Sequence, residues 1–379
     1  MSTRTVTIVQ RRLTHYRVPL FVRMREQLAT HGIELRLLHG DATASEATKG
    51  DAGDLPWAER LPTRYLLGDR ICWQPFMRQA SGSHLVIVTQ ENKQVNNLLA
   101  LLRLHPRRPA LAFWGHGRNM QSRHPDGALE RFKRWTTNRV DWWFAYTELS
   151  AAFVRDDGFP AERVTVLNNS IDTNELRAAV ALARETPRAA LREALGLRPD
   201  GALAVFLGSL YADKRIAFLL DAANDIRQHV PGFELVVAGD GPDRGLVEAA
   251  AARHPHVHYL GNVRGARKAQ LLSAADLMLN PGLVGLGILD SFVASVPMLT
   301  TDCHLHSPEI SYLHHGENGL MTADDRAAFV SATVQLLGDR EALERLSRGA
   351  GAAGEDYSIE RMAERFTNGI RACLSSAQR

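Results

Sequence analysis

Residues 281–302 of the chain read PGLVGLGILDSFVASVPMLTTD. A loop with three glycines comes first, an apolar segment with one carboxylate, Asp290, follows, and Pro297 then introduces a strand-like run. This order predicts a loop, a helix, a turn and a buried strand of an α/β sheet. Free N–H groups and the positive end of the helix dipole would meet at the helix start and suit a phosphate. A tight turn without a ligand explains the same residues, so both interpretations stay open here.

The alternation of strand, loop and helix continues on both sides of this stretch. Near the N-terminus, an apolar strand pattern at 5–9 precedes a helical pattern at 18–31 and a second strand at 33–38. A second series of the same kind begins at 202–207 and runs into the 281–302 stretch, after a charged helical segment at 173–199. The pattern predicts two α/β domains with parallel sheets and binding sites at the carboxyl ends of the strands. We expect the domains at 1–185 and 186–357, with a C-terminal helix at 358–379 that packs back toward the first domain.

Size and composition restrict the class of protein. The chain has 379 residues, too many for one ordinary core, and its 45 basic and 42 acidic residues give a net charge of +3. This near balance does not indicate nucleic acid as the main partner. The three cysteines form no CxxC pair and indicate a reducing compartment. No secretory leader or spanning segment stands out, so we expect a cytoplasmic protein.

Residues 129–144 combine basic side chains with three tryptophans. A basic helix of this kind can lie on an anionic membrane surface. However, residues 140–145 also match a strand, which would bury some of the tryptophans. We favour core packing with a solvated basic face, while a weak peripheral contact at the inner face of the membrane remains the alternative.

Several polar residues follow predicted strands and are candidates for a site. Lys214 and Arg215 come shortly after strand 202–207, where a helix begins and cations are unfavourable without a function. His116 stands between two glycines after strand 110–113, which leaves its ring uncovered. In the first strand–helix loop, a polar or anionic substrate could contact Arg12, His15, Tyr16 and Arg17, although a solvated loop explains each of them singly.

Other motifs indicate what the chain lacks. The glycine loops at 239–241 and 115–117 have Arg244 and Met120 where a dinucleotide fingerprint needs its third glycine. There is no GxxxxGK[ST] motif either, so the sequence does not favour nicotinamide, flavin or P-loop enzymes. The cluster Asp302, His304, His306 and Glu309 lacks a standard zinc spacing, and we interpret it as a polar loop after a strand.

Taken together, these motifs resemble the family 4 glycosyltransferases, which are retaining enzymes of GT-B fold that use nucleotide sugars. The match is clearest over 205–319. The pieces that carry it are Gly208-Ser209 with Lys214 five residues on, the GDGP turn at 239–242, GNV at 261–263, Gly285 with Asp290, Glu309, and GENG at 316–319. In the first domain, His116 is similar to the family's crevice histidine, and 169–172 is similar to its Asn-Gly-Val-Asp motif. The implied fold is GT-B, with two facing Rossmann-like domains and a deep cleft between them.

The resemblance implies a hexosyl transfer from a UDP-sugar, or another nucleotide sugar such as a GDP-sugar, to a hydroxyl of a sugar, glycolipid or small molecule, without cofactor or metal. It implies that Lys214 and His116 act at the reacting centre. It also implies a donor site formed by Asp290 at the ribose, Ser209, Arg215 and the loop Gly285, Leu286 and Gly287 at the diphosphate, and Val263 and Arg264 beside the base. The loop with Arg12, His15, Tyr16 and Arg17 would then face the acceptor.

Two positions depart from the family pattern. The first acid of the signature pair falls at Gly282, and the arginine of the phosphate pair is Ser209, which leaves Arg215 as a substitute. The missing acid at Gly282 makes a catalytically silent sugar-nucleotide-binding subunit an alternative. The main alternative among enzymes is a GT-B sugar-nucleotide epimerase, and a peripheral membrane scaffold is a third, based on 129–144 alone.

Overall fold

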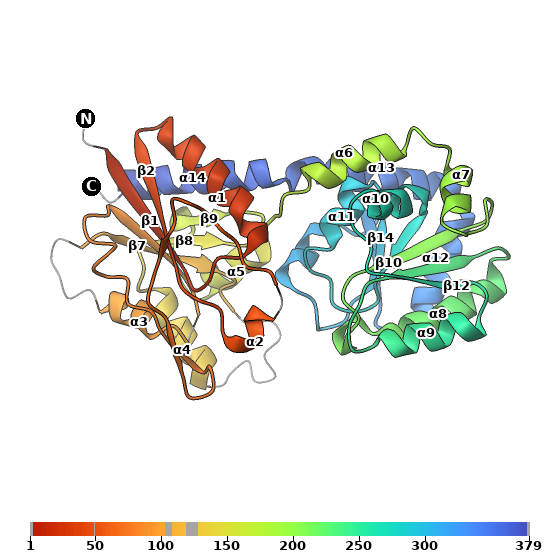
Figure 1. Cartoon of the computed structure of the whole chain (residues 1–379), viewed down its shortest axis with the longest axis horizontal. Helices are drawn as coiled ribbons and strands as arrows, with labels where there is room; N and C mark the ends of the chain where they lie inside the picture. The colour runs from red at the N-terminus through yellow and green to blue at the C-terminus, as the bar shows by residue number, and fades with distance from the viewer. Residues whose placement is uncertain (1–2, 49, 92, 103–107, 119–127, 377–379) are drawn as a thin grey trace. The chain divides into compact units, whose positions relative to one another are not determined.

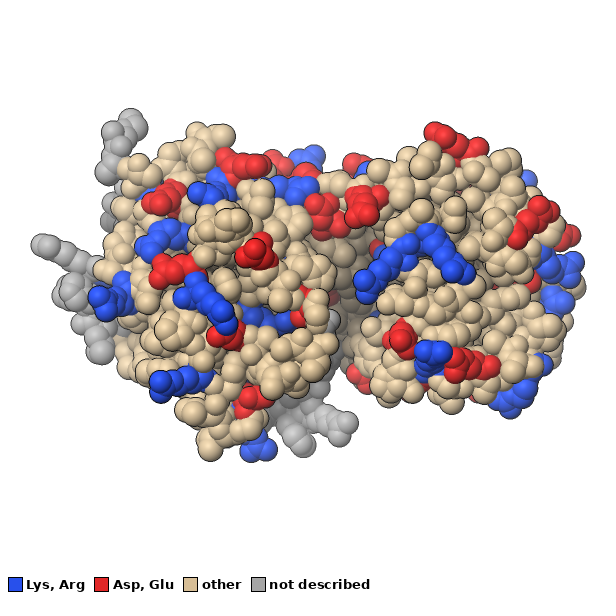
Figure 2. All heavy atoms as spheres, in the orientation of Figure 1, with Lys and Arg blue, Asp and Glu red and all other residues tan. Residues whose placement is uncertain are grey.

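The structure is a computed structural model that describes residues 3–48, 50–91, 93–102, 108–118 and 128–376 (Figure 1). It divides into two compact units. Unit 1 contains residues 1–172 together with 358–379, and unit 2 contains residues 173–357. Lys and Arg side chains are interspersed with Asp and Glu over the face shown in Figure 2, in keeping with the near balance of charge.

Unit 1 is built on a seven-stranded parallel sheet in the order β3-β2-β1-β6-β7-β8-β9. Its strands are β1 (Arg4–Gln10), β2 (Ile33–His39), β3 (Glu59–Arg60), β6 (Leu85–Thr89), β7 (Ala110–Gly115), β8 (Trp142–Ala145) and β9 (Val164–Val166). A separate antiparallel pair is formed by β4 (Arg64–Leu66) and β5 (Ile71–Trp73). The strand expected at 140–145 is confirmed, and it buries Trp142 and Trp143 while Trp135 stays half exposed.

Helices cover both faces of this sheet. They are α1 (Val18–Ala29), α2 (Ala44–Ala47), α3 (Val95–Leu101), α4 (Ala128–Thr137), α5 (Glu148–Asp156) and α14 (Ile359–Ser376), with short 3-10 turns η1 (His15–Arg17) and η2 (Ala161–Arg163). The C-terminal helix α14 packs against α1, β8 and β9 (Figure 1). Phe366 of α14 is fully buried against Phe144 and Trp114, at ring-centroid distances of 4.5 and 5.0 Å. The last helix of the chain therefore completes the core of the first unit.

Unit 2 contains a six-stranded parallel sheet in the order β12-β11-β10-β13-β14-β15. Its strands are β10 (Leu203–Leu207), β11 (Glu234–Ala238), β12 (Val257–Gly261), β13 (Leu277–Leu279), β14 (Met298–Thr301) and β15 (Gly319–Thr322). The strands expected from 202 onward agree with these bounds to within one or two residues.

The helices of unit 2 are α6 (Asn174–Ala183), α7 (Arg188–Ala194), α8 (Ile216–His229), α9 (Arg244–Arg253), α10 (Gly265–Ala274), α11 (Ile288–Val293), α12 (Arg326–Gly338) and α13 (Arg340–Asp356), with turns η3 (Ala212–Lys214) and η4 (Pro308–Tyr312). The division after Asp172 lies earlier than the expected boundary at 185, because α6 packs against α10 and α11 of unit 2. None of the helices in the described ranges is long and apolar enough to cross a membrane.

Residues 41–56 are rich in Ala, Thr, Gly and Asp without apolar periodicity, which predicts a mobile insertion. In the structure, the described residues 41–48 and 50–56 are instead held against the end of β1. Thr43 and Glu46 form a capping box at the start of α2. Arg11 donates two hydrogen bonds to Glu46, and Arg12 donates two to Asp51. These ion pairs fix a segment that has no apolar periodicity of its own, which is why periodicity alone did not reveal it.

Candidate active site

In unit 2, the chain direction across the sheet reverses between β10 and β13. Because all neighbouring strands are parallel, their carboxyl ends share one edge, and ligands of such sheets bind outside that edge at the reversal. The loop 208–215 follows β10, and the loop 280–287 follows β13. The two loops singled out in the sequence therefore meet at the position where this kind of sheet binds its ligand.

Backbone contacts hold the two loops against each other. Leu283 N donates to the Asp213 carbonyl oxygen at 2.8 Å, and Lys214 Nζ donates to the Leu283 carbonyl oxygen at 2.5 Å. A Cβ atom at Gly282 would lie 2.3 Å from the Asp213 carbonyl oxygen. A side chain at 282 would thus force the loops apart, so the position of the missing first acid is one where this chain needs glycine.

Two further glycines bring a third loop against 208–215. A Cβ at Gly239 would lie 1.8 Å from the Gly208 carbonyl oxygen, and one at Gly241 would lie 2.2 Å from the Leu210 carbonyl oxygen. The glycines of the GDGP turn therefore let its backbone pack closely against the loop that follows β10. This packing role agrees with the sequence of the turn, which does not match a dinucleotide fingerprint.

Lys214 is a largely buried cation at this junction. The Leu283 carbonyl oxygen accepts its hydrogen bond, and no carboxylate among the described residues lies within ion-pair distance. Burial lowers the pKa of Lys214 to about 8, although Cys303 and Asp213 oppose that shift. A buried ammonium group without a carboxylate is unfavourable on its own and favourable beside an anion.

Arg215 has a different role in the structure. It adopts the left-handed conformation, with φ of 56°, at the start of α8. Its guanidinium forms an ion pair with Asp324 and also donates to Thr301 Oγ1 at 3.2 Å. Arg215 thus connects the ends of β10, β14 and β15, and its charge is already paired, in contrast to that of Lys214.

The glycine loop leaves backbone donors unused. The N–H groups of Ile288, Leu289 and Asp290 donate to the carbonyl oxygens of residues 285, 286 and 287. Within the described ranges, the N–H groups of Gly285, Leu286 and Gly287 themselves have no acceptor. Successive free N–H groups of this kind can bind anionic oxygens.

A buried histidine, His306, fixes this loop through a hydrogen bond to its backbone. Val284 N donates to His306 Nδ1 at 3.1 Å, and His306 Nε2 lies 2.7 Å from the Thr301 carbonyl oxygen. Nδ1 must therefore be the acceptor, and Nε2 must carry the proton. His306 thus holds the loop in place. Among the described residues, no group of three His, Cys, Asp or Glu side chains could hold a metal ion.

Asp290 lies one turn into α11, where Lys268 Nζ of α10 forms an ion pair with it at 2.7 Å. Burial raises the pKa of Asp290, while Lys268 acts in the opposite direction. Sequence analysis did not single out Lys268, because nothing at the start of α10 marks it. The pair connects α11 with α10, which begins right after Val263 and Arg264. Ser209, another predicted donor residue, is exposed in the loop after β10, and its side chain has no hydrogen bond to the described residues.

In unit 1, His116, Tyr146 and Arg17 lie together beyond the carboxyl ends of β7, β8 and β1. The His116 ring stacks on Tyr146 at a centroid distance of 4.2 Å. The guanidinium of Arg17 lies 5.1 Å from the Trp114 ring and 5.5 Å from the Tyr146 ring. Sequence analysis did not single out Tyr146. The only sequence signal for this residue is its position directly after the strand at 140–145.

The other acceptor-side candidates lie apart from this cluster or on its rim. Arg12 is occupied by Asp51, and His15 Nδ1 lies 3.3 Å from the Asp51 carbonyl oxygen. Tyr16 is 38% exposed, and its ring lies 5.3 Å from the guanidinium of Arg17. The structure thus brings Tyr16, Arg17 and His116 into one neighbourhood and turns Arg12 toward segment 41–56.

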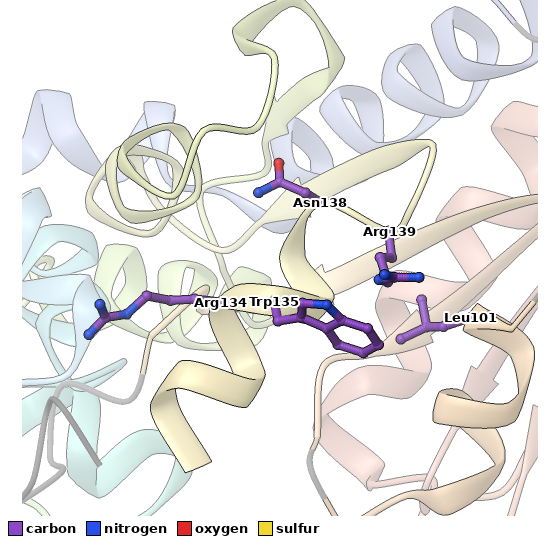
Figure 3. Close-up of a pocket in the computed structure, with 5 residues that line it drawn as sticks. All are labelled: Leu101, Arg134, Trp135, Asn138 and Arg139. Carbon is purple, nitrogen blue, oxygen red and sulfur yellow. The ribbon is translucent and has the colours of Figure 1, made fainter. Parts of the chain in front are cut away.

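Each unit also contains a hollow away from these strand ends. In unit 1, a hollow of about 530 Å³ lies between α3 and α4, where the Trp135 indole lies beside Arg139 and Leu101 while Arg134 extends away (Figure 3). In unit 2, a hollow of about 590 Å³ is lined in part by Asp276 and Val296, which precede β13 and β14. That hollow lies at the amino edge of the sheet, opposite Lys214.

Comparison with solved structures identifies the fold. The crystal structure of Anabaena HepE in complex with UDP matches with a TM-score of 0.69 and 16% identity, over 97% of this chain and 99% of that one. This protein has the GT-B fold. Residues 201–339 also match the family model described as "Glycosyl transferases group 1".

Two relatives share part of their sequence with this GT-B protein. The alpha-monoglucosyldiacylglycerol synthase of Acholeplasma laidlawii is 23% identical over 177 residues, which are 45% of this chain and 44% of that protein. The D-inositol 3-phosphate glycosyltransferase of Nocardia farcinica is 29% identical over 205 residues, 50% of this chain and 45% of that protein. The matches thus span less than half the length of these relatives.

Proposed function

We propose that this GT-B protein is a retaining glycosyltransferase that moves a sugar from a nucleotide sugar, a UDP-sugar in the first instance, to an acceptor hydroxyl. The observation that carries the proposal is Lys214, a largely buried cation at the reversal point of the unit 2 sheet with no carboxylate of the described residues within ion-pair distance. The match of 201–339 to group 1 glycosyl transferases covers this same region, and HepE was solved with UDP.

In this proposal, Lys214 and the free N–H groups of Gly285, Leu286 and Gly287 bind the diphosphate. Negative charge grows on that group as the bond to the sugar breaks, and a fixed positive potential stabilises the charge best where water is excluded. The departing phosphate oxygen takes the acceptor's proton on the same face, so the anomeric configuration is kept. The proposed chemistry uses these side-chain and backbone donors, and we assign no metal to it.

The remaining donor contacts follow from the surroundings of Asp290. Its carboxylate accepts hydrogen bonds from the ribose hydroxyls, and Lys268 fixes its orientation. Val263 and Arg264, at the start of α10, lie beside the base. His116 contacts the transferred sugar or orients the acceptor.

A binding panel followed by a transfer assay tests the proposal. We expect UDP and UDP-sugars to raise the unfolding temperature of the full chain, and NAD to leave it unchanged. Label from a UDP-sugar should then appear in an acceptor from an extract of sugars and lipids, with the anomeric proton coupling of the donor. Absence of any shift with UDP- and GDP-sugars would refute nucleotide-sugar binding, and rearranged free sugar without labelled acceptor would indicate an epimerase instead.

A further inference from the structure

Arg17 is the buried cation of unit 1 that the proposed chemistry leaves unexplained. The residue is only 7% exposed, although it lies in the short turn η1 between β1 and α1. Three neighbouring arginines each pair with carboxylates: Arg11 with Glu46, Arg12 with Asp51, and Arg23 with Asp172. Arg17 has no carboxylate within ion-pair distance among the described residues.

Aromatic rings surround Arg17 and leave its donors unused. The guanidinium carbon lies 5.3, 5.1 and 5.5 Å from the ring centroids of Tyr16, Trp114 and Tyr146. Such contacts engage the faces of the rings, whereas the five N–H donors of a guanidinium lie in its own plane. Among the described residues, the side-chain acceptor near these donors is the Met362 sulfur, 4.0 Å from Nη1, which is a weak acceptor.

One further donor lacks an acceptor, and a helix begins nearby without a capping side chain. The Nε1–H group of Trp114 is fully buried and has no hydrogen-bond partner. Helix α1 begins right after Arg17 without a side-chain cap and without an acidic residue in its first turn. The positive end of a 12-residue helix thus adds to the guanidinium, and the first turn of that helix contains no acidic residue that would offset it.

We infer that Arg17 binds an anionic group of a substrate, a phosphate or a carboxylate, within the cage of Tyr16, Trp114 and Tyr146. A planar fork of donors matches the paired oxygens of these two groups. The rings keep the guanidinium fixed and exclude water, which strengthens the contact with an anion. Tyr146 also stacks on His116, so the anion would lie close to the histidine of the proposed acceptor site.

This inference names the acceptor class and to that extent rests on the proposed transfer. The acceptor would be an anionic molecule, such as a phosphorylated or carboxylated sugar or lipid headgroup. The same oxygen chemistry is present in the donor's diphosphate, and the experiment separates the two sources. Anion binding itself can be measured whether or not sugar transfer occurs.

The first measurement is the rise in unfolding temperature of the full chain when phosphate replaces chloride at constant ionic strength. All chains carry Lys214→Ala, which removes the lysine proposed to bind the diphosphate in unit 2. We expect a smaller phosphate-dependent rise in Arg17→Met than in the control Arg23→Met, because phosphate stabilises any folded chain to some extent and only the control keeps Arg17. Arg23 is already paired with Asp172 and Glu360. Equal rises in the two variants would overturn the inference.

A second measurement covers the case in which the methionine variant does not fold. In the unsubstituted chain, phosphate should shift one arginine Nε–H resonance that is missing from the spectrum of Arg17→Lys. If that resonance does not move at saturating phosphate, Arg17 binds no anion and the inference fails.

Calorimetry with UDP then identifies the source of the anion. An unchanged UDP affinity in Arg17→Met assigns the site to the acceptor, and a loss of about tenfold or more assigns it to the donor's diphosphate. Either result assigns the anion site once the phosphate measurements have established it. A wild-type chain that binds phosphate at Arg17 but no UDP would refute the proposed function and leave the anion site standing.

Discussion

Replacing Lys214 by methionine should weaken donor binding and at the same time stabilise the empty protein. The pKa of Lys214 is lowered by burial from the ordinary 10.5 to about 8. This difference corresponds to roughly 3 kcal/mol of unfavourable free energy for the charged side chain at neutral pH. Methionine has a similar volume and no charge, so it avoids that cost.

The hydrogen bond to the Leu283 carbonyl oxygen limits the gain. Removing the lysine loses a charged hydrogen bond that contributes about 1.5–3 kcal/mol. The carbonyl oxygen keeps a second donor, because Asn280 Nδ2 lies 3.2 Å away. We therefore expect a net stabilisation of about 1 kcal/mol, or a rise of roughly 2–4 °C in the unfolding temperature of unit 2.

Donor affinity should change in the opposite direction. A charge-assisted contact with a diphosphate oxygen corresponds to roughly a 10- to 100-fold change in the dissociation constant of UDP. Titration calorimetry measures this loss, and differential scanning calorimetry measures the unfolding temperature. Higher stability combined with lost affinity is the behaviour of a residue retained for function.

Lys268→Met is the matched control. Lys268 is also a partly buried lysine of unit 2, but it pairs with Asp290 at 2.7 Å. Removing it leaves a buried carboxylate unpaired, so its unfolding temperature should fall. The reasoning would be refuted if Lys214→Met lowered the unfolding temperature as Lys268→Met does, or if it bound UDP as tightly as the unsubstituted chain.

Three more outcomes are expected. UDP affinity should fall about tenfold from pH 7 to pH 9, because the charged fraction of Lys214 drops from roughly nine-tenths to one-tenth around its pKa of about 8. Over the same pH range, calorimetry of the empty chain should show a rising free energy of unfolding. The reason is that the unfolded chain still binds the proton that the folded lysine has lost. Gly282→Ala should lower the free energy of unfolding by about 1–3 kcal/mol in denaturant titrations, whereas Gly287→Ala, with open space around its Cβ position, should lower it by less than about 1 kcal/mol. Phe366→Ala should cost about 3–5 kcal/mol in unit 1, because the ring is fully buried; a smaller loss would mean that α14 contributes little to that core.

Periodicity predicted most of the strands, because the parallel sheets are buried on both faces and their strands read as short apolar runs. The strand expected at 202–207 is β10, which begins one residue later and ends at the expected residue. Segment 41–56 was not predictable in this way. Its order depends on two bidentate arginine contacts from the end of β1, and such contacts between distant residues leave no local pattern.

The roles of individual cations were even less accessible from the sequence. Lys214 and Arg215 are neighbours in the chain, and both looked like phosphate ligands. The structure separates them, because Arg215 adopts a left-handed conformation and turns its guanidinium to Asp324. Arg12 and Arg17 diverge in the same way, since only Arg12 finds a carboxylate. Which cation stays unpaired depends on where carboxylates from other elements lie, and this is a tertiary property.

Position 282 shows how the structure changes the meaning of a sequence difference. In the family pattern an acidic residue stands at this position, and this chain has glycine there instead. In this protein the backbone at 282 lies directly against Asp213 and Lys214, and a Cβ atom would come within 2.3 Å of a carbonyl oxygen. The close approach brings the Leu283 carbonyl oxygen to Lys214 Nζ and so helps to bury the cation. Glycine at 282 is thus a condition for the geometry of Lys214, and contacts with the sugar hydroxyls would have to come from other residues of the site.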